Sequence, residues 1–310
     1  MRLSLTFILA AISITSAAVV KREAQAVRLA VKPKCGTFSG DVADVNAGLK
    51  PLNAYKTIVA FGDAYSDGGV QNGSPLKPAV VTPPSPLAGG RSSDGPIWLE
   101  NLAVTAGATL KDYATAGAVI DSTAYPGLSQ SSVRDLSEQV NFFTGQGVKH
   151  DPETTLYTIF FGINDFELGT DLDVAAQNIA YRLLVLSSSP TFAKNILVVD
   201  NYGRGKRSPE GEAFKQQVFS ELKALRSFLK LNIGFVDLST IWDGVLGSSP
   251  GYQAFGYTNP GACAVSAKTS AGACTDPEHS FYWLPGTPSA ATHRIIADYV
   301  NQVLTTCKAT

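Results

Sequence analysis

The stretch TIVAFGDAYSD at residues 57–67 decides the fold class. Its first five residues form a short apolar run that ends at Gly62 and Asp63, a pattern typical of a strand buried on both faces. Four similar segments follow, and helical patterns separate them. We therefore expect five parallel strands joined by right-handed crossovers. The predicted strands cover residues 57–61, 110–113, 155–161, 195–200 and 233–237.

Amphipathic segments fill most of the remaining chain. The clearest has apolar residues Val133, Leu136, Val140 and Phe143 on one helical face. Residues 70–95 contain several prolines together with many glycines and serines, and they predict a long loop. No internal repeat or second core is visible. The sequence thus predicts one α/β domain, a three-layer α/β/α sandwich at residues 23–310. The predicted helices cover residues 98–106, 133–143, 174–186, 209–231 and 290–304.

Composition narrows the range of partners. The chain has 310 residues, of which 45% are hydrophobic and 16% charged, and its formal net charge is −1. This balance gives no electrostatic basis for a nucleic-acid partner. No segment after the leader is apolar enough to span a membrane. Protein partners cannot be inferred from these features.

The N-terminus predicts secretion. Arg2 precedes an apolar run, and small residues follow it, as in a signal peptide at residues 1–17. The dibasic pair Lys21-Arg22 then predicts a short propeptide at residues 18–22. An interfacial membrane anchor is the alternative interpretation of the apolar run. We expect the protein to be extracellular.

Secretion determines how the cysteines are interpreted. Four cysteines in an oxidising compartment suggest two disulfides, and three pairings are possible. We favour Cys263–Cys274, which closes a short loop, and Cys35–Cys307, which ties the termini together. The spacing suggests no metal site, and nothing in the sequence indicates a cofactor. Asn72, in Asn-Gly-Ser, is the predicted glycosylation site.

Unusual residues cluster where the predicted strands end, which is where open parallel sheets bind ligands. The four blocks are FGDAYSD at residues 61–67, YATAGA at 113–118, FGIND at 161–165 and FYWLPGTP at 281–288. In this order they resemble the SGNH/GDSL hydrolase family over residues 57–303. GRSSDGPIW at residues 90–98 resembles a further block of secreted fungal and plant members.

The resemblance implies a flavodoxin-like fold and acyl transfer through a serine, with a histidine as base. It places Gly117 and Asn164 on oxyanion-hole positions, where N–H donors stabilise the developing alkoxide. Asp63 and Asp165 are expected to hold the site loops in shape by accepting backbone N–H bonds. Active relatives of this kind would cleave short acyl esters of carbohydrates, small esters or lipids. The ligand of this chain is therefore expected to be an acylated carbohydrate or a small ester or lipid.

The reacting groups themselves are replaced. Ala64 occupies the nucleophile position, Thr287 the histidine position and Leu284 the aspartate position. A methyl group cannot attack a carbonyl, and an alcohol is a negligible base near neutral pH. In serine hydrolases, loss of the serine or histidine lowers turnover by about 10⁶. Starting from a median of about 10 s⁻¹, that leaves on the order of 10⁻⁵ s⁻¹. The sequence predicts a catalytically impaired member of the family.

Three alternatives are open from the sequence. Ser66, two residues after Ala64, is either a substitute nucleophile or a capping hydroxyl. His293 is either a structural side chain or a rival base that activates water against a bound ester, which would make the protein an active hydrolase. The segment Asp276–His279 contains D-x-x-H, but it precedes the aromatic block that this motif follows in the family. An engineered change at Ala64 would not account for Thr287.

Overall fold

The computed structural model describes residues 26–125, 133–169 and 172–309. The predicted signal peptide at residues 1–17 and the propeptide at residues 18–22 lie outside the described residues.

The central sheet has six strands in the order β1-β6-β5-β4-β2-β3. They are β1 (Val45–Ala47), β2 (Thr57–Gly62), β3 (Thr109–Asp112), β4 (Thr155–Phe160), β5 (Asn195–Asp200) and β6 (Asn232–Asp237). All neighbours pair in parallel except β1, which is antiparallel to β6. The predicted five-stranded parallel sheet is confirmed, and its strand order is flavodoxin-like. The sequence analysis missed β1 because three residues carry no periodic signal.

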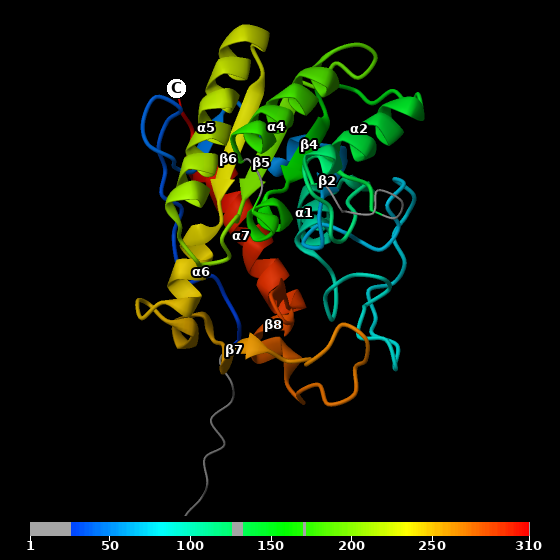
Figure 1. The fold of residues 1–310 in the computed structure, drawn as a ribbon, viewed down its shortest axis with the longest axis vertical. Helices are drawn as coiled ribbons and strands as arrows, with labels where there is room; N and C mark the ends of the chain where they lie inside the picture. The colour runs from blue at the N-terminus through cyan, green and yellow to red at the C-terminus, as the bar shows by residue number, and fades with distance from the viewer. Residues whose placement is uncertain (1–25, 126–132, 170–171, 310) are drawn as a thin grey trace, which may run out of the picture.

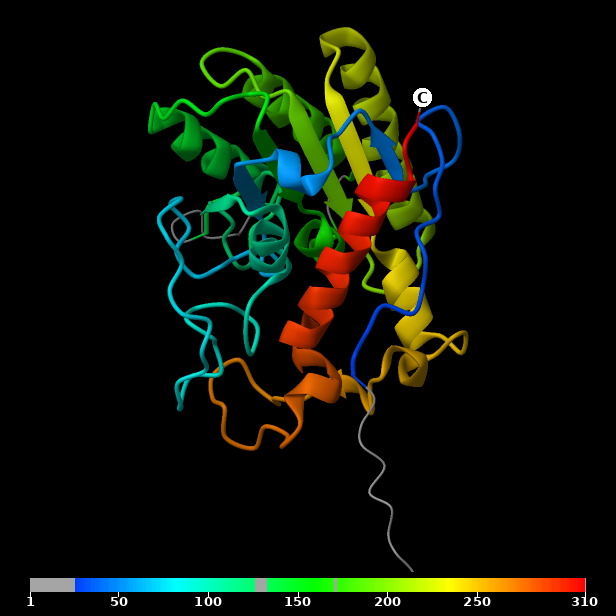
Figure 2. The ribbon, with the colours of Figure 1, turned by 180° about the vertical axis from the view of Figure 1, so that it is seen from behind.

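Helices cover both faces of this sheet and make the predicted three layers. Along β2, Ile58 and Ala60 face one core, whereas Val59 and Phe61 face the other. Helices α2, α4 and α5 lie on the near face in Figure 1, and Figure 2 shows α7 crossing the opposite face beside α1. The helices are α1 (Trp98–Ala106), α2 (Leu136–Gly145), α3 (Ile163–Leu168), α4 (Leu172–Ser187), α5 (Pro209–Leu229), α6 (Ser239–Leu246) and α7 (Ala290–Thr306).

Local sequence explains where these helices begin. The Ser289 hydroxyl accepts a hydrogen bond from the Thr292 backbone N–H, which caps the start of α7. Ser208 caps α5 in the same way, and Pro209 occupies the first turn, where no N–H is needed. Four short 3-10 helices complete the helical segments: η1 (Leu52–Ala54), η2 (Ser122–Ala124), η3 (Tyr252–Phe255) and η4 (Pro277–His279).

A second, three-stranded sheet lies at the lower end of the molecule in Figure 1. It consists of β7 (Asn259–Ala262), β8 (Ser280–Leu284) and β9 (Thr287–Pro288). The Trp283 indole N–H donates to the Pro86 carbonyl at 2.7 Å, which joins this sheet to the long proline-rich loop. The sequence analysis did not anticipate it, because β9 has only two residues.

Two disulfides are present, and they are the two pairings that the sequence favoured. Cys35–Cys307 joins the N-terminal segment to the residue that follows α7, and Cys263–Cys274 closes the loop after β7. Among residues 26–125, 133–169 and 172–309, no helix combines the length and the apolar character needed to span a bilayer. In the same residues, no three His, Cys, Asp or Glu side chains are grouped as a metal site.

Candidate functional site

The first site segment follows β2 and makes a tight turn. The Asp63 carbonyl accepts hydrogen bonds from the backbone N–H groups of Ser66 and Asp67, at 3.0 and 2.9 Å. The carboxylate of Asp63 accepts a third from the N–H of Tyr65 at 2.9 Å. These bonds leave Ala64 half-buried, just after the carboxyl end of β2.

Gln139 of α2 fixes the backbone that leads into this turn. Its side-chain oxygen accepts from the Gly62 N–H at 3.0 Å, and its amide N–H donates to the Gly62 carbonyl at 2.9 Å. A buried side chain thus makes the paired bonds that a neighbouring strand would otherwise supply. The position of Ala64 is therefore set by α2 as well as by the sheet.

Asp63 is the most perturbed carboxyl group of the turn. It is 1% exposed, and its Oδ2 atom has no hydrogen-bond partner among the described residues. The pKa of Asp63 is raised to about 7, mainly by burial and to a lesser extent by the negative charge of Asp165, whereas the bond from Tyr65 and the charge of Arg204 oppose the rise. The protonated form of this carboxyl is thus present at neutral pH.

The second and third site segments meet beside the turn. Residues 115–118 form a turn closed by the Ala118 N–H on the Thr115 carbonyl at 3.0 Å. Gly117 has φ +83°, which only glycine adopts without strain, and among the described residues its N–H has no partner. Asn164, in α3, donates its side-chain N–H to the Ala118 carbonyl at 2.7 Å. The Asn164 side chain thus lies against the turn that contains Gly117. Among the described residues, the Gly117 N–H and the second side-chain N–H of Asn164 remain available.

Two carboxylates tie these segments to one another. Asp67 accepts from the Ala116 N–H at 2.7 Å, which links the first segment to the second. Asp165 is buried and accepts from the Ile120 N–H at 3.1 Å and from the Tyr125 hydroxyl at 2.6 Å. Burial raises the pKa of Asp165 to about 6, and the Tyr125 bond opposes this rise.

The fourth segment is the turn between β8 and β9. Leu284 is buried against Cys263, Ala264 and Trp283, so it takes part in a small apolar core. Thr287 is half-buried, and its hydroxyl donates to the Leu284 carbonyl at 3.5 Å. Tyr65 joins this turn to the first segment, because its hydroxyl donates to the carbonyl of Gly286 at 2.7 Å.

The comparison with known protein families agrees with this arrangement. The family model of GDSL-like lipases and acylhydrolases matches residues 58–300. The chain belongs to the GDSL-like lipase/acylhydrolase family. Its α/β fold with a central parallel sheet agrees with this membership.

Individual similarities are distant. An acetylesterase of Hypocrea jecorina is 28% identical over 147 residues, which is 42% of this chain and 42% of that protein. A thermolabile hemolysin of Vibrio parahaemolyticus is 22% identical over 282 residues, 82% of this chain and 64% of that protein. The chain thus spans less than two thirds of either relative. Among solved structures, a G-D-S-L family protein from Veillonella parvula aligns at TM-score 0.45 with 14% identity, covering 81% of this chain and 99% of that one. A family two carbohydrate esterase from Clostridium thermocellum aligns at 0.48 with 14% identity, covering 82% and 64%.

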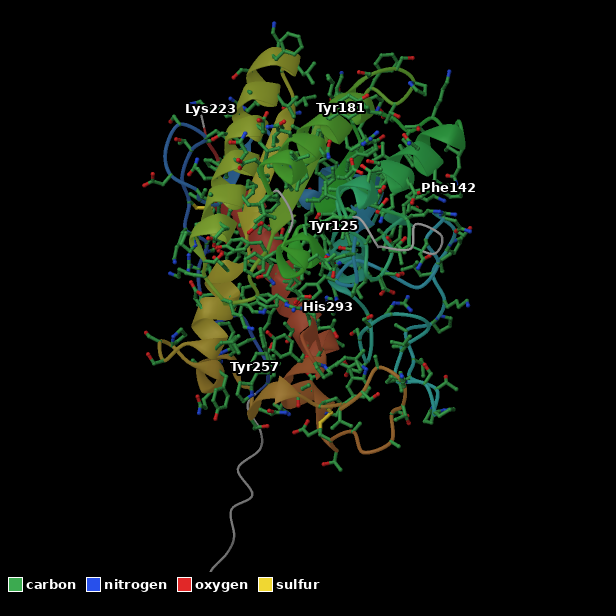
Figure 3. The ribbon with its side chains drawn as sticks, in the orientation of Figure 1. Tyr125, Phe142, Tyr181, Lys223, Tyr257 and His293 are labelled. Atoms are coloured by element: carbon green, nitrogen blue, oxygen red, sulfur yellow. A yellow bond between two sulfur atoms is a disulfide. The ribbon has the colours of Figure 1, made fainter. Side chains whose placement is uncertain are left out.

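The rival reacting groups lie in unreactive surroundings. Ser66 is fully buried, and its hydroxyl accepts from the Trp98 indole N–H at 3.2 Å. His293 lies on α7 in the middle of the molecule, between the labels of Tyr125 and Tyr257 in Figure 3. It is 1% exposed, its Nδ1 atom has no partner among the described residues, and burial lowers the pKa of His293 to about 3. Among the residues that the structure describes, neither group has a hydrogen-bond partner that would activate it.

Two further sequence features lie outside these four segments: the D-x-x-H stretch, which the sequence analysis set against the family order, and the predicted glycosylation site. Asp276 and His279 form an ion pair at 2.8 Å within and just before η4, on the disulfide-closed side of β8. Asn72 is exposed in the long loop, and its side-chain oxygen accepts from the Ser74 N–H at 3.0 Å.

A cavity of about 360 Å³ borders the site, and the sequence analysis did not identify its residues. Arg204, from the loop between β5 and α5, forms an ion pair with Glu167 of α3. The Arg204 guanidinium also donates to the Gly286 carbonyl at 3.4 Å, in the turn that precedes Thr287. The only sequence signal for this feature is GRGKR at residues 203–207, which places three cations directly after a predicted strand.

Proposed function

We propose that this chain is an extracellular GDSL-family protein that recognises an acyl ester but does not hydrolyse it at a useful rate. One sequence feature supports the proposal: the family resemblance assigns Ala64 to the nucleophile position and Thr287 to the base position, while Gly117 and Asn164 keep the residue types of an oxyanion hole. The Gly117 N–H and the Asn164 amide can stabilise an oxygen that gains negative charge. With no nucleophile and no base, these donors bind a carbonyl or carboxylate oxygen without starting acyl transfer.

The structural surroundings of the replaced positions support the same proposal. Leu284 is buried among apolar side chains, where an aspartate would be an unpaired buried charge. His293 cannot serve as an effective base, since a group with a pKa near 3 is a weak proton acceptor at neutral pH. The active hydrolase that uses His293-activated water is thus disfavoured by the burial of this ring.

The ligand class follows from the family and from the name of one relative. The partial match to an acetylesterase supports a short acyl ester as the recognised group. We propose an acylated carbohydrate as ligand, with a small ester or a lipid as the alternatives. Two disulfides support an oxidising, extracellular location. Removal of the signal peptide at residues 1–17 and glycosylation of Asn72 belong to the same proposal.

Hydrolysis of nitrophenyl acetate and nitrophenyl butyrate tests the proposal. The natural protein is expected to turn over at or below about 10⁻⁵ s⁻¹, from the loss of both dyad members. The double variant Ala64→Ser with Thr287→His should raise this rate by at least about 10²-fold, because it restores a nucleophile and a base beside the retained donors. Leu284 stays unchanged, so its apolar cluster remains intact.

The matched control is Ala64→Ser with Thr287→Gln, which supplies the hydroxyl without a base. It should remain near the rate of the natural protein, and a fluorophosphonate probe should label the histidine-containing variant alone. Turnover above 1 s⁻¹ by the natural protein, or probe labelling of it, would refute the proposal. In that case, loss of the activity in His293→Ala would identify the alternative mechanism.

A further inference from the structure

The cavity beside the site is built from five parts of the fold. α3, the loop after β5, the end of α6, β8 and the β8–β9 turn all contribute to its wall. It lies at the carboxyl end of the parallel sheet, where ligands of open α/β folds bind. Its volume of about 360 Å³ is at the small end of the range for ligand pockets. The cavity thus has the size for one or two sugar rings rather than a long lipid chain.

One side of the cavity is cationic. Arg204 and Lys206 line it, and Glu167 is its single acidic residue. Lys206 is exposed and, among the described residues, forms no ion pair. Arg204 is partly buried and holds the carboxylate of Glu167. The cavity therefore has a surplus of one positive charge, and its guanidinium is already positioned to bind a carboxylate.

Aromatic side chains make up much of the remaining lining. Phe166 and Tyr202 pack edge to face with ring centroids 5.4 Å apart, and Tyr282 joins them in the wall. The hydroxyls of both tyrosines are engaged, since Tyr202 bonds Glu212 and Tyr282 accepts from the Trp242 indole at 2.9 Å. These rings consequently present apolar surface to a ligand. A lining that combines aromatic rings with a surplus cation fits a sugar ring that carries a carboxylate.

The cavity also adjoins the ester site directly. The carbonyl of Gly286 accepts from both Tyr65, next to Ala64, and Arg204, and Gly286 immediately precedes Thr287. We propose that this cavity binds a sugar acid, a uronate unit of the carbohydrate whose acyl group reaches Gly117 and Asn164. This inference rests on the proposed function, which it extends by naming the ligand's charge. In the unliganded protein, the Glu167 carboxylate forms an ion pair with Arg204 and would compete with the carboxylate of the ligand.

Binding of tri-galacturonic acid, measured by isothermal titration calorimetry at low salt, tests the proposal. Galactotriose is the matched neutral probe, with the same ring stereochemistry and no carboxylate. The acidic trisaccharide should bind at least about tenfold tighter, and Arg204→Gln should remove most of that difference, as charge-assisted hydrogen bonds predict. Glu167→Gln should instead tighten binding severalfold, because it frees the guanidinium.

The control variant is Lys223→Gln, which makes the same charge change on α5, at the upper left of Figure 3 and far from His293. It should leave the affinity unchanged, and thermal unfolding verifies that each variant is folded. Equal affinity for the two trisaccharides, or weaker binding by Glu167→Gln, would overturn the proposal. Competition by acetate at the concentration of the trisaccharide would overturn the assignment to a sugar. Ester turnover by the natural protein would refute the proposed function, while the charge dependence of binding remains measurable.

Discussion

Replacement of Asp63 by asparagine is expected to stabilise the protein, and increasingly so as the pH rises. The carboxyl group is almost fully buried, with one oxygen that lacks a partner among the described residues. Its pKa is about 7 in the folded protein, against about 3.9 in an unfolded chain. A raised folded pKa means that the folded state binds more protons, so stability is present below pH 4 and is lost as the pH rises toward 7.

The magnitude follows from this shift. Each pKa unit corresponds to about 1.36 kcal/mol, so ionising Asp63 costs about 1.5 kcal/mol of folding free energy at pH 5 and about 4 kcal/mol at pH 8. Asparagine keeps an oxygen for the Tyr65 N–H and carries no charge. The gain in stability from Asp63→Asn should therefore grow by about 2–3 kcal/mol between pH 5 and pH 8.

Urea unfolding of both proteins at pH 5 and pH 8, followed by far-ultraviolet circular dichroism, measures this difference. The matched control is Asp151→Asn, which removes a carboxyl from an exposed link before β4. The stability change caused by Asp151→Asn should be small and should not grow between pH 5 and pH 8. If the stabilisation by Asp63→Asn were equal at the two pH values, the carboxyl would not be held protonated by burial, and the reasoning would fail.

Three further perturbations have defined outcomes. The variant His293→Leu should become more stable relative to the natural protein as the pH falls from 6.5 toward 4. The lowered pKa of folded His293 means that the natural protein loses about 1.4 kcal/mol of stability per pH unit through this range. Unfolding curves at pH 7 and pH 4.5 measure the stability difference between the two proteins, and a constant difference would contradict the prediction. Gln139→Leu should cost roughly 2–4 kcal/mol, because it leaves both polar groups of Gly62 with fewer partners in a buried site. Gln217→Leu is the control, because this half-buried glutamine of α5 donates to the Glu221 side chain and to no strand backbone in the described residues; an equal cost would argue against the bracing role. Replacing both cysteines of Cys35–Cys307 by serine should lower the unfolding free energy by about 5 kcal/mol, and the same change at Cys263–Cys274 should lower it by about 3 kcal/mol. A disulfide that closes a longer loop restricts the unfolded chain more, and the sequence separations are 272 and 11 residues. A larger loss at Cys263–Cys274 would refute this dependence on loop length.

The central sheet could be predicted because its signal is local. The inner strands β4 and β5 are mostly apolar and buried along their whole length, so the sequence itself records their burial, whereas the edge strand β3 is partly exposed. The strands β1, β7 and β9 carry too weak a local signal: β7 pairs irregularly with β8, and the two residues of β9 form a hairpin with β8. β1, for example, pairs with β6, almost two hundred residues later, and its three residues show no alternation. Such strands exist because tertiary packing brings the edges together.

The site was predictable to the extent that its parts are motifs. Gly117 and Asn164 could be located because each stands in a short block at the end of a predicted strand. Arg204 could not, since its role arises from the placement of its loop against α3 and the β8–β9 turn. The burial of His293 was recoverable from sequence, because it falls on the helical face that also carries Ile296, Val300 and Val303.

The retained donors do not by themselves argue for turnover. Asn164 holds the Ala118 carbonyl, Asp67 holds the Ala116 N–H and Asp165 holds the Ile120 N–H, so the same contacts that shape an oxyanion hole also brace the ends of β2 and β4 and the loop after β3. Loss of these residues would leave buried polar groups unpaired, whatever the protein does.

Ala64 and Thr287 are different in this respect. Apart from the weak bond from Thr287 to Leu284, their side chains make no hydrogen bond in the described residues. Ala64 could therefore be replaced by serine and Thr287 by histidine without breaking the hydrogen bonds of Asn164, Asp67 and Asp165. Under the proposed assignment, hydrogen bonds within the fold hold the donors, whereas the two reacting positions take no part in these bonds. Recovery of hydrolysis by restoring only these two residues would follow from that separation. Failure of a folded double variant to recover any hydrolysis would mean that the donors are no longer aimed at the reacting position.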